Sequence, residues 1–224
     1  MTVTRNKEEY LQPSELCDFD RCFEIRAEAL ELTSNCRRRE EKLQRIFSFV
    51  KEMPYGLEDW DVRASETLAK GWGMCSGKTN LLVALLRSVG IPARYRVFRI
   101  KGEIKLWKWA IESEDLSQRL GTVPLEQNHV DCEVWLGTWK AFDPSRDTPL
   151  ERGMLALGIP LEREPLVEEN GRVPYLFLAS FDDWARERQN RRMFRENRDE
   201  IFAMINERFQ QIRALSRRGD RSLG

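Results

Sequence analysis

The segment of sequence that decides the fold is G-W-G-M-C-S-G-K-T-N, residues 71–80, which runs directly into L-L-V-A-L-L-R, residues 81–87. Its leucines recur at helical spacing, so the sequence predicts a buried amphipathic helix that begins near Cys75. Gly90 followed by Pro92 is a common helix stop. A thiol in the first helical turn lies beside unpaired N–H groups and the positive end of the helix dipole, which favours the thiolate. The segment therefore predicts a nucleophilic cysteine, provided that a base lies nearby.

Composition limits the class of protein. The 224 residues carry 37 basic and 37 acidic side chains, which gives no argument for binding nucleic acid or an anionic membrane. Five cysteines, without the spacing of a disulfide scaffold, favour a reducing, cytoplasmic location. No apolar run approaches the roughly 20 residues of a membrane-spanning helix, and no signal peptide is expected. Cys17 and Cys22 lack the spacing of a zinc site, and neither a metal nor a cofactor is expected.

Helical and strand patterns occupy separate parts of the chain. Residues 35–51 have one apolar face typical of a helix, which Pro54 ends. Beyond Pro92, four runs have the pattern of β-strands: 93–100, 104–110, 129–136 and 139–142. Residues 101–103 are expected to form a hairpin turn and residues 112–128 a loop. A helical segment followed by adjacent antiparallel strands indicates an α+β fold.

The C-terminal third has a different character. Residues 148–175 are rich in proline and glutamate, and we expect them to form an irregular cover. Residues 181–218 are expected to form a long charged helix. Its apolar stripe is expected to dock onto the domain or onto a second copy of the chain.

His129 is the single histidine of the chain and the candidate base for Cys75. A Cys–His–Asp relay needs the thiol beside the imidazole and a carboxylate that orients the imidazole through its other nitrogen. Paired antiparallel strands can bring Asp143 next to His129, and a helix packed across them can add Cys75. From spacing alone, a buried structural cysteine explains the same residues equally well.

Three motifs, in the order expected, resemble those of the transglutaminase-like superfamily. They are Gly73-Met74-Cys75 with Gly90-Ile91-Pro92-Ala93-Arg94, His129 with Glu133-Val134-Trp135-Leu136, and Phe142-Asp143-Pro144-Ser145. The resemblance covers roughly residues 40–146. It implies a papain-like α+β core in which Cys75 is the nucleophile, His129 the base and Asp143 the orienting group. Members of this family are protein crosslinkers, amide hydrolases and peptidases, and some branches are inactive scaffolds.

The resemblance implies a thiol enzyme that acts on amide bonds of a protein or peptide through an acyl-enzyme on Cys75, with hydrolysis favoured over crosslinking. The alternative is a catalytically inactive binding or assembly module with the same fold. The expected organisation is an N-terminal helical arm at 1–35, a catalytic core at 36–147, and a cover with the C-terminal helix at 148–224. That helix is also a candidate homodimer surface.

Aromatic side chains supply candidates for a substrate cleft. Trp60 and Trp72 are candidate substrate-binding residues, and Trp107 and Trp109 could line the same cleft, although ordinary packing explains each of them too. Besides the backbone N–H of Cys75, Trp60 and Tyr55 are candidates for a second oxyanion donor.

Polar residues near the motifs have competing interpretations. Gly77-Lys78-Thr79 resembles the end of a phosphate-binding loop, but Trp72 stands where that loop needs a glycine. Lys78 is expected to be exposed, or else to favour the Cys75 thiolate. Asp131 is expected to be a solvated strand residue with a structural role.

Overall fold

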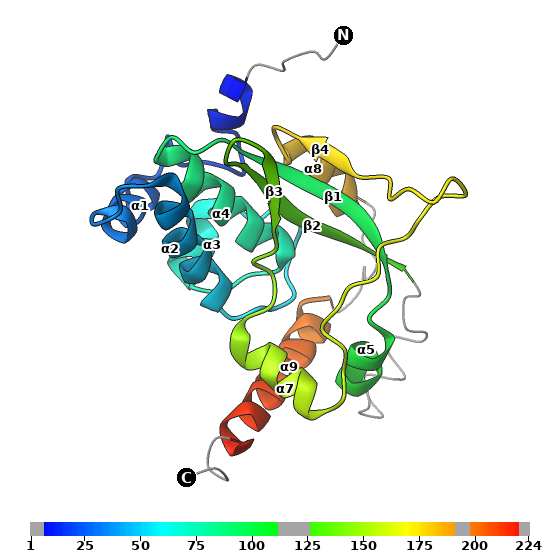
Figure 1. Ribbon diagram of the computed structural model, residues 1–224. Coiled ribbons are helices and arrows are strands. Elements are labelled where there is room, and N and C mark those ends of the chain that lie inside the picture. Colours follow the sequence, from blue (N-terminus) through cyan, green and yellow to red (C-terminus); the bar gives the residue numbers. More distant parts are fainter. Residues whose placement is uncertain (1–6, 112–125, 191–197, 220–224) are drawn as a thin grey trace.

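The computed structural model describes residues 7–111, 126–190 and 198–219 (Figure 1). In chain order, the elements are η1 (Lys7–Leu11, a 3-10 helix), α1 (Phe23–Thr33), α2 (Arg39–Glu52), α3 (Ala64–Lys70), α4 (Cys75–Ser88), β1 (Ala93–Lys101), α5 (Ile104–Ile111), β2 (Glu126–Trp135), β3 (Trp139–Phe142), α7 (Thr148–Ala156), β4 (Leu176–Leu178), α8 (Asp182–Asn190) and α9 (Arg198–Gly219).

Helix α4 is the centre of the molecule. Every side chain from Cys75 to Arg87 is buried, because α1, α2 and α3 cover one side of the helix and strands β1 and β2 cover another. Figure 1 shows this cluster of helices beside the sheet, with α7 and α9 packed together at one end of the molecule. The predicted buried helix beginning at Cys75 and the predicted α+β class are confirmed.

The sheet is antiparallel throughout, with the strand order β3-β2-β1-β4. Strand β3 pairs only with residues 132–135 of β2, so residues 129–131 have a sheet neighbour on one side only, strand β1. In the register between β1 and β2, Phe98 lies opposite His129 and Arg96 lies opposite Asp131. The chain leaves β3 at Phe142, which places Asp143 beside this unpaired part of β2.

The expected strand at residues 104–110 is wrong, because this segment forms helix α5. Its buried side chains, Leu106 and Ala110, are four residues apart, which is a helical spacing. In the run I-K-L-W-K-W-A, Lys105 and Lys108 are three residues apart, which also fits a helical period. Strand β1, to which a hairpin would have joined this segment, is already paired with β2 and β4.

One expectation about the C-terminal third also needs correction. The supposed irregular cover contains α7, which begins where the Asp147 carboxylate caps the helix by accepting a hydrogen bond from the Leu150 N–H at 3.0 Å. Pro149 in its first turn is compatible with a helix start. Of the expected helix at 181–218, the structure describes α8 and α9, while residues 191–197 between them lie outside the described part of the chain. Most of the expected loop at 112–128 also lies outside it, while residues 126–128 already belong to β2.

Helix α9 packs its apolar stripe inside the chain. The buried members of the stripe are Ile201, Ile205, Phe209 and Ile212. The contact with α7 is close enough that a Cβ atom at Gly153 would overlap the backbone carbonyl oxygen of Ile212. A glycine at this position therefore sets the distance between the two helices.

Replacing Gly153 by alanine tests this contact. Because the added methyl group meets backbone rather than a movable side chain, we expect Gly153→Ala to lower the free energy of unfolding by about 1–3 kcal/mol. Urea unfolding measures this difference. Leu155→Ala is the control on the same helix, because Leu155 is exposed and its loss should change stability by less than about 0.5 kcal/mol. Equal effects of the two substitutions would contradict the close contact.

Candidate active site

Cys75 is the first residue of α4, and its thiol is positioned by the segments that surround the start of this helix. The preceding residue, Met74, donates its backbone N–H to Glu58 Oε1 at 2.8 Å. Glu58 can lie under the first turn because residue 77 is a glycine, and a Cβ there would be 2.5 Å from Glu58 Oε1. Only 5% of Cys75 is exposed, so the thiol lies at the helix N-terminus in a largely desolvated setting.

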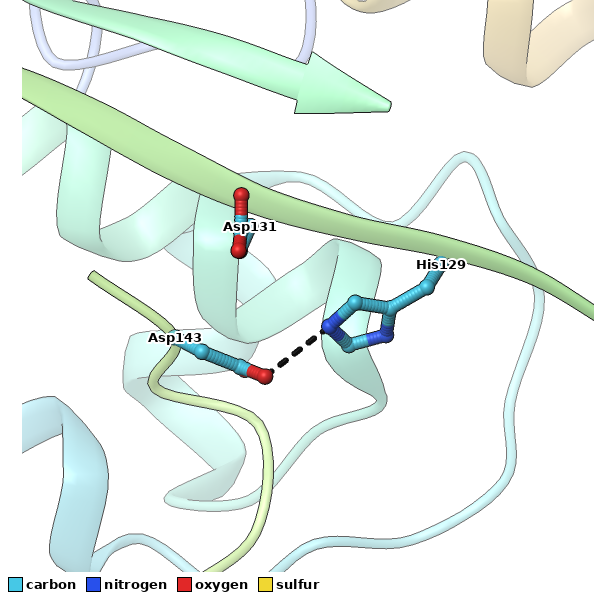
Figure 2. Close-up of side chains that lie close together, drawn as sticks. All are labelled: His129, Asp131 and Asp143. Atoms are coloured by element: carbon cyan, nitrogen blue, oxygen red, sulfur yellow. Dashed lines mark hydrogen bonds and ion pairs between the residues drawn. The ribbon is translucent and has the colours of Figure 1, made fainter. Parts of the chain in front are cut away.

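His129 and Asp143 are brought together as the sequence predicts. His129 Nε2 lies 2.9 Å from Asp143 Oδ2, and Asp143 Oδ1 accepts the backbone N–H of Ser145 at 2.9 Å (Figure 2). The Phe98 ring stands edge-on to the imidazole, with the centroids 5.3 Å apart. His129 is only 3% exposed, so its ring is held by packing as well as by the carboxylate.

The electrostatics of this group favour a charged imidazole. Burial alone would lower the pKa of His129, but the charge of the Asp143 carboxylate, its hydrogen bond with the ring and an interaction with the Cys75 side chain raise it to about 9. The Cys75 thiol is therefore near enough to the imidazole to affect its pKa. Burial would raise the pKa of Asp143, yet the neighbouring charges of His129 and Arg163 hold it well below its ordinary value. Asp143 is therefore anionic at neutral pH.

A second carboxylate, that of Asp131, belongs to the same cluster. The expectation of a solvated residue is wrong, since Asp131 is 2% exposed and is bound by the fork of Arg96, with Arg96 Nε 2.8 Å from Oδ1. Figure 2 shows its carboxylate beside the His129–Asp143 pair. The signal in the sequence was the alternation of Arg94, Arg96 and Phe98 against Glu133, Asp131 and His129, but it could be read only with the register known.

His129, Asp131 and Asp143 are close enough to be considered as metal ligands, because their ligand atoms lie within 4.8 Å of one another. Each carboxylate oxygen already accepts a hydrogen bond, however. Arg96 occupies both oxygens of Asp131, while Ser145, His129 and Arg163 occupy those of Asp143. Two guanidinium groups beside the carboxylates also oppose a divalent cation. The arrangement fits a hydrogen-bonded relay better than a metal site.

Lys78 is not the exposed residue that the sequence suggested. Its side chain is fully buried, and Nζ donates to the carbonyl oxygens of Met53 at 2.5 Å and Lys51 at 3.1 Å. These carbonyls lie at the C-terminal end of α2, where a cation is favourable. Burial nevertheless lowers the pKa of Lys78 to about 7. Lys78 therefore ties the cysteine helix to α2.

The candidate substrate residues are both partly exposed and both packed. The Trp60 ring meets Trp184 edge-on, with the centroids 5.2 Å apart, and the Lys70 ammonium lies 4.5 Å from the centroid of the Trp72 ring. These contacts neither require nor prevent a role in a cleft, which stays a prediction. The backbone N–H of Tyr55 is engaged by Asp147 at 2.8 Å, which leaves the hydroxyl of Tyr55 as its only donor for an oxyanion.

Helix α9 supports the loop next to Cys75. The sequence gave no signal for this contact. Asp147 accepts the Tyr55 N–H, and Arg213 donates to the Tyr55 carbonyl at 2.6 Å and to Asp147. Asn206 likewise binds both the N–H and the carbonyl of Leu57, at 2.6 and 3.0 Å. Tyr55 in turn forms a β-bridge with Gly73, two residues before Cys75. The C-terminal helix is thus connected to the segment before Cys75 by hydrogen bonds from its side chains to the backbone.

The fold and the site together define a class: α+β proteins in which a thiol at a helix N-terminus meets a strand histidine that is oriented by an aspartate. The family model for the core of the transglutaminase-like superfamily matches residues 26–144, more than half of the chain. The chain belongs to the transglutaminase-like superfamily.

Individual relatives are distant. The uncharacterized protein ML0607 of Mycobacterium leprae (strain TN) is 25% identical over 87 residues, which are 39% of this chain and 27% of that protein. A Cytophaga hutchinsonii structure, described as a candidate cysteine protease, aligns with a TM-score of 0.47 and 21% identity over 67% of this chain and 45% of that one. Red sea bream transglutaminase aligns with a TM-score of 0.35 and 12% identity over 84% of this chain and 43% of that one. The chain thus spans about a quarter of the curated relative and less than half of each solved structure.

A membrane-spanning helix is not found in the described part of the chain, where each helix is too short or too polar to cross a bilayer.

Lys78 allows a test of the electrostatics around α4. Its pKa is lowered to about 7 in the folded protein and returns to an ordinary value near 10.5 on unfolding, so the folded state gains stability as the pH rises from 7 to 10. We expect the free energy of unfolding of the wild type, minus that of Lys78→Met, to increase by on the order of 1 kcal/mol per pH unit over this range. Lys140→Met, at an exposed position on β3, is the control. A difference that does not change with pH would contradict the buried lysine.

Proposed function

We propose that this protein is a thiol enzyme that acts on amide bonds of a protein or peptide through an acyl-enzyme on Cys75. The observation that carries the proposal is the position of His129, which is hydrogen-bonded to Asp143 and lies close enough to Cys75, at the N-terminus of α4, for the thiol to raise its pKa. An imidazole between a thiol and a carboxylate is the arrangement that converts cysteine into a nucleophile at neutral pH.

The chemistry follows from these positions. The Cys75 thiolate attacks the amide carbonyl carbon and forms a C–S bond. The His129 imidazolium then donates its proton to the leaving nitrogen as the C–N bond breaks. In the second half, His129 takes a proton from water, which attacks the thioester and releases the acid. Asp143 stabilises the imidazolium in both halves.

The developing oxyanion needs donors next to Cys75. The backbone N–H of Cys75 is the first, because it lies in the first turn of α4 and has no intrahelical acceptor. The Tyr55 hydroxyl is the candidate for the second. Burial, assisted by the negative charge of Cys75, raises the pKa of Tyr55, so its hydroxyl keeps the proton that it would donate.

Hydrolysis is the reaction that we favour over transfer to an amine, since water is always available as an acceptor. A reducing, cytoplasmic environment suits the five free cysteines. The second candidate function, an inactive binding module, is favoured by one observation: Cys75 and His129 are 5% and 3% exposed, so a substrate reaches them only if the site opens.

Thiol reactivity distinguishes the two functions. We expect iodoacetamide at pH 7 to modify Cys75 at least about tenfold faster than Cys17 or Cys132. All three thiols are buried, but burial raises the pKa of Cys17 to about 11 and that of Cys132 well above its ordinary value. Peptide mass spectrometry gives the rate at each site. His129→Ala should remove the difference; a wild-type Cys75 that reacts no faster than Cys132 would favour the binding module.

The members of the relay should differ in importance. Cys75→Ala removes the attacking atom and His129→Ala the only imidazole, so each should reduce turnover of a peptide amide by on the order of 10⁴-fold or more, with little further loss in the double variant. Asp143→Asn keeps a hydrogen-bond acceptor without the charge and should cost on the order of 10²–10⁴-fold. Cys132→Ala is the matched control at a buried thiol outside the relay. If Asp143→Asn lowers the melting temperature but not the activity per folded molecule, Asp143 is a turn residue only.

A further inference from the structure

Arg163 contacts the relay from outside the part of the chain that matches the family. Its Nη1 donates to Asp143 Oδ2, the same oxygen that faces His129 Nε2. The side chain is 12% exposed, and residue 163 lies 19 positions beyond residue 144, the last residue of the family match. The guanidinium is therefore a largely enclosed partner of the Asp143 carboxylate that the family motifs do not include.

We propose that Arg163 is a positioning residue of the relay, which fixes the Asp143 carboxylate in the orientation that His129 requires and shares its negative charge. The proposal depends on the proposed function only for its catalytic meaning, because the contact itself is structural. With Ser145 bound to Oδ1, and His129 and Arg163 bound to Oδ2, neither carboxylate oxygen is free to rotate away from the imidazole.

The backbone around Arg163 is held in place by strand-like pairing with the end of β1. The Lys101 N–H donates to the Glu164 carbonyl at 2.8 Å, and the Leu166 N–H donates to the Arg99 carbonyl at 2.9 Å. Pro165 forms an isolated bridge with Ile100 between these two bonds. The pairing with β1 thus positions Arg163 next to Asp143, just as the pairing of β2 with β1 positions His129.

A second acidic residue completes the surroundings of Arg163. Glu103, just before α5, lies 3.8 Å from Arg163 Nε and 3.1 Å from Arg146 Nη1. Tyr55 and Cys75 also face the guanidinium. Burial would lower the pKa of Arg163, but Asp143 and Glu103 raise it, so the group is cationic throughout the working range of pH.

The charged and titratable groups around His129 come from five parts of the chain. Asp143 follows β3, Cys75 begins α4, Asp131 lies on β2 with its partner Arg96 on β1, and Arg163 comes from the segment after α7. Of these, Asp143 raises the pKa of His129 and Arg163 lowers it. A general base works best when its pKa is near the operating pH. Arg163 therefore limits the rise in the pKa of His129 that Asp143 causes, so that the imidazolium releases its proton more readily.

The single histidine makes this inference directly measurable. NMR titration of histidine-labelled full-length protein reports His129 alone, without a substrate. We expect the wild-type pKa near 9 and an upward shift, on the order of one unit, in both Arg163→Met and Arg163→Gln. Glutamine retains a donor for Asp143, so it provides a second neutral variant if methionine prevents folding.

Arg146→Met is the matched control. Arg146 is buried and binds the same Glu103, but it makes no hydrogen bond to Asp143. If Arg163 only supports its segment, its loss will lower the melting temperature and leave the pKa of His129 unchanged; that result, or an equal shift in Arg146→Met, overturns the proposal. An unreactive Cys75 in the wild type would reject the proposed function separately, since the titration does not depend on the thiol chemistry.

Discussion

The enclosure of helix α4 is the constraint on which the rest of the structure depends. A helix buried along its whole length cannot rotate or slide without exposing apolar surface, so the position of Cys75 is fixed by packing. The polar side chains that α4 buries strengthen this enclosure. Lys78 binds carbonyls at the end of α2, and Arg87 donates to the carbonyls of Ala93, Gln12 and Ala179, which belong to three separate segments. Each buried cation is thereby satisfied and becomes a connection between distant parts of the chain.

The sequence was sufficient for those parts of the site that depend on local pattern. The helix that begins at Cys75, the strand that carries His129 and the hairpin that ends at Asp143 follow from periodicity and turn residues, and their order resembles that of the family. What the sequence could not supply is register. Asp131 is buried because β1 places Arg96 opposite it, and nothing within β2 alone indicates this partner. The segment that forms α5 was expected to pair with β1, but β1 lies between β2 and β4, which the sequence of this segment does not show.

The region beyond the family match contributes support rather than a separate unit. The apolar stripe of α9 predicted that this helix would pack against another part of the protein. The stripe did not indicate which backbone groups the polar residues of the helix would bind. Asn206 binds both the N–H and the carbonyl of Leu57, as a neighbouring strand would. Asp147 accepts the N–H of Tyr55, and Arg213 donates to the carbonyl of Tyr55. Such contacts join positions between 66 and 158 residues apart and involve single side chains, so they leave no periodic signal. Four members of the stripe, Ile201, Ile205, Phe209 and Ile212, are buried within the chain, and the homodimer surface on this helix stays a prediction.

The charged groups around His129 and Asp143 nearly balance, and two titratable groups, His129 and Lys78, change the stability of the fold with pH in opposite directions. Three carboxylates, those of Asp143, Asp131 and Glu103, meet three guanidinium groups, those of Arg163, Arg96 and Arg146. The opposite charges of these groups lie next to one another, so the site is charged but close to neutral, which limits the cost of burying it. His129, with a folded pKa of about 9 against an ordinary 6.5, contributes stability that is complete below pH 6.5 and is lost as the pH rises through 9. Lys78 has the opposite sign, because its burial cost is present below pH 7 and is relieved above it. Between pH 7 and 9 the two trends oppose each other. The folded site can therefore keep a protonated imidazole beside the thiol without making the stability of the fold depend steeply on pH in that range.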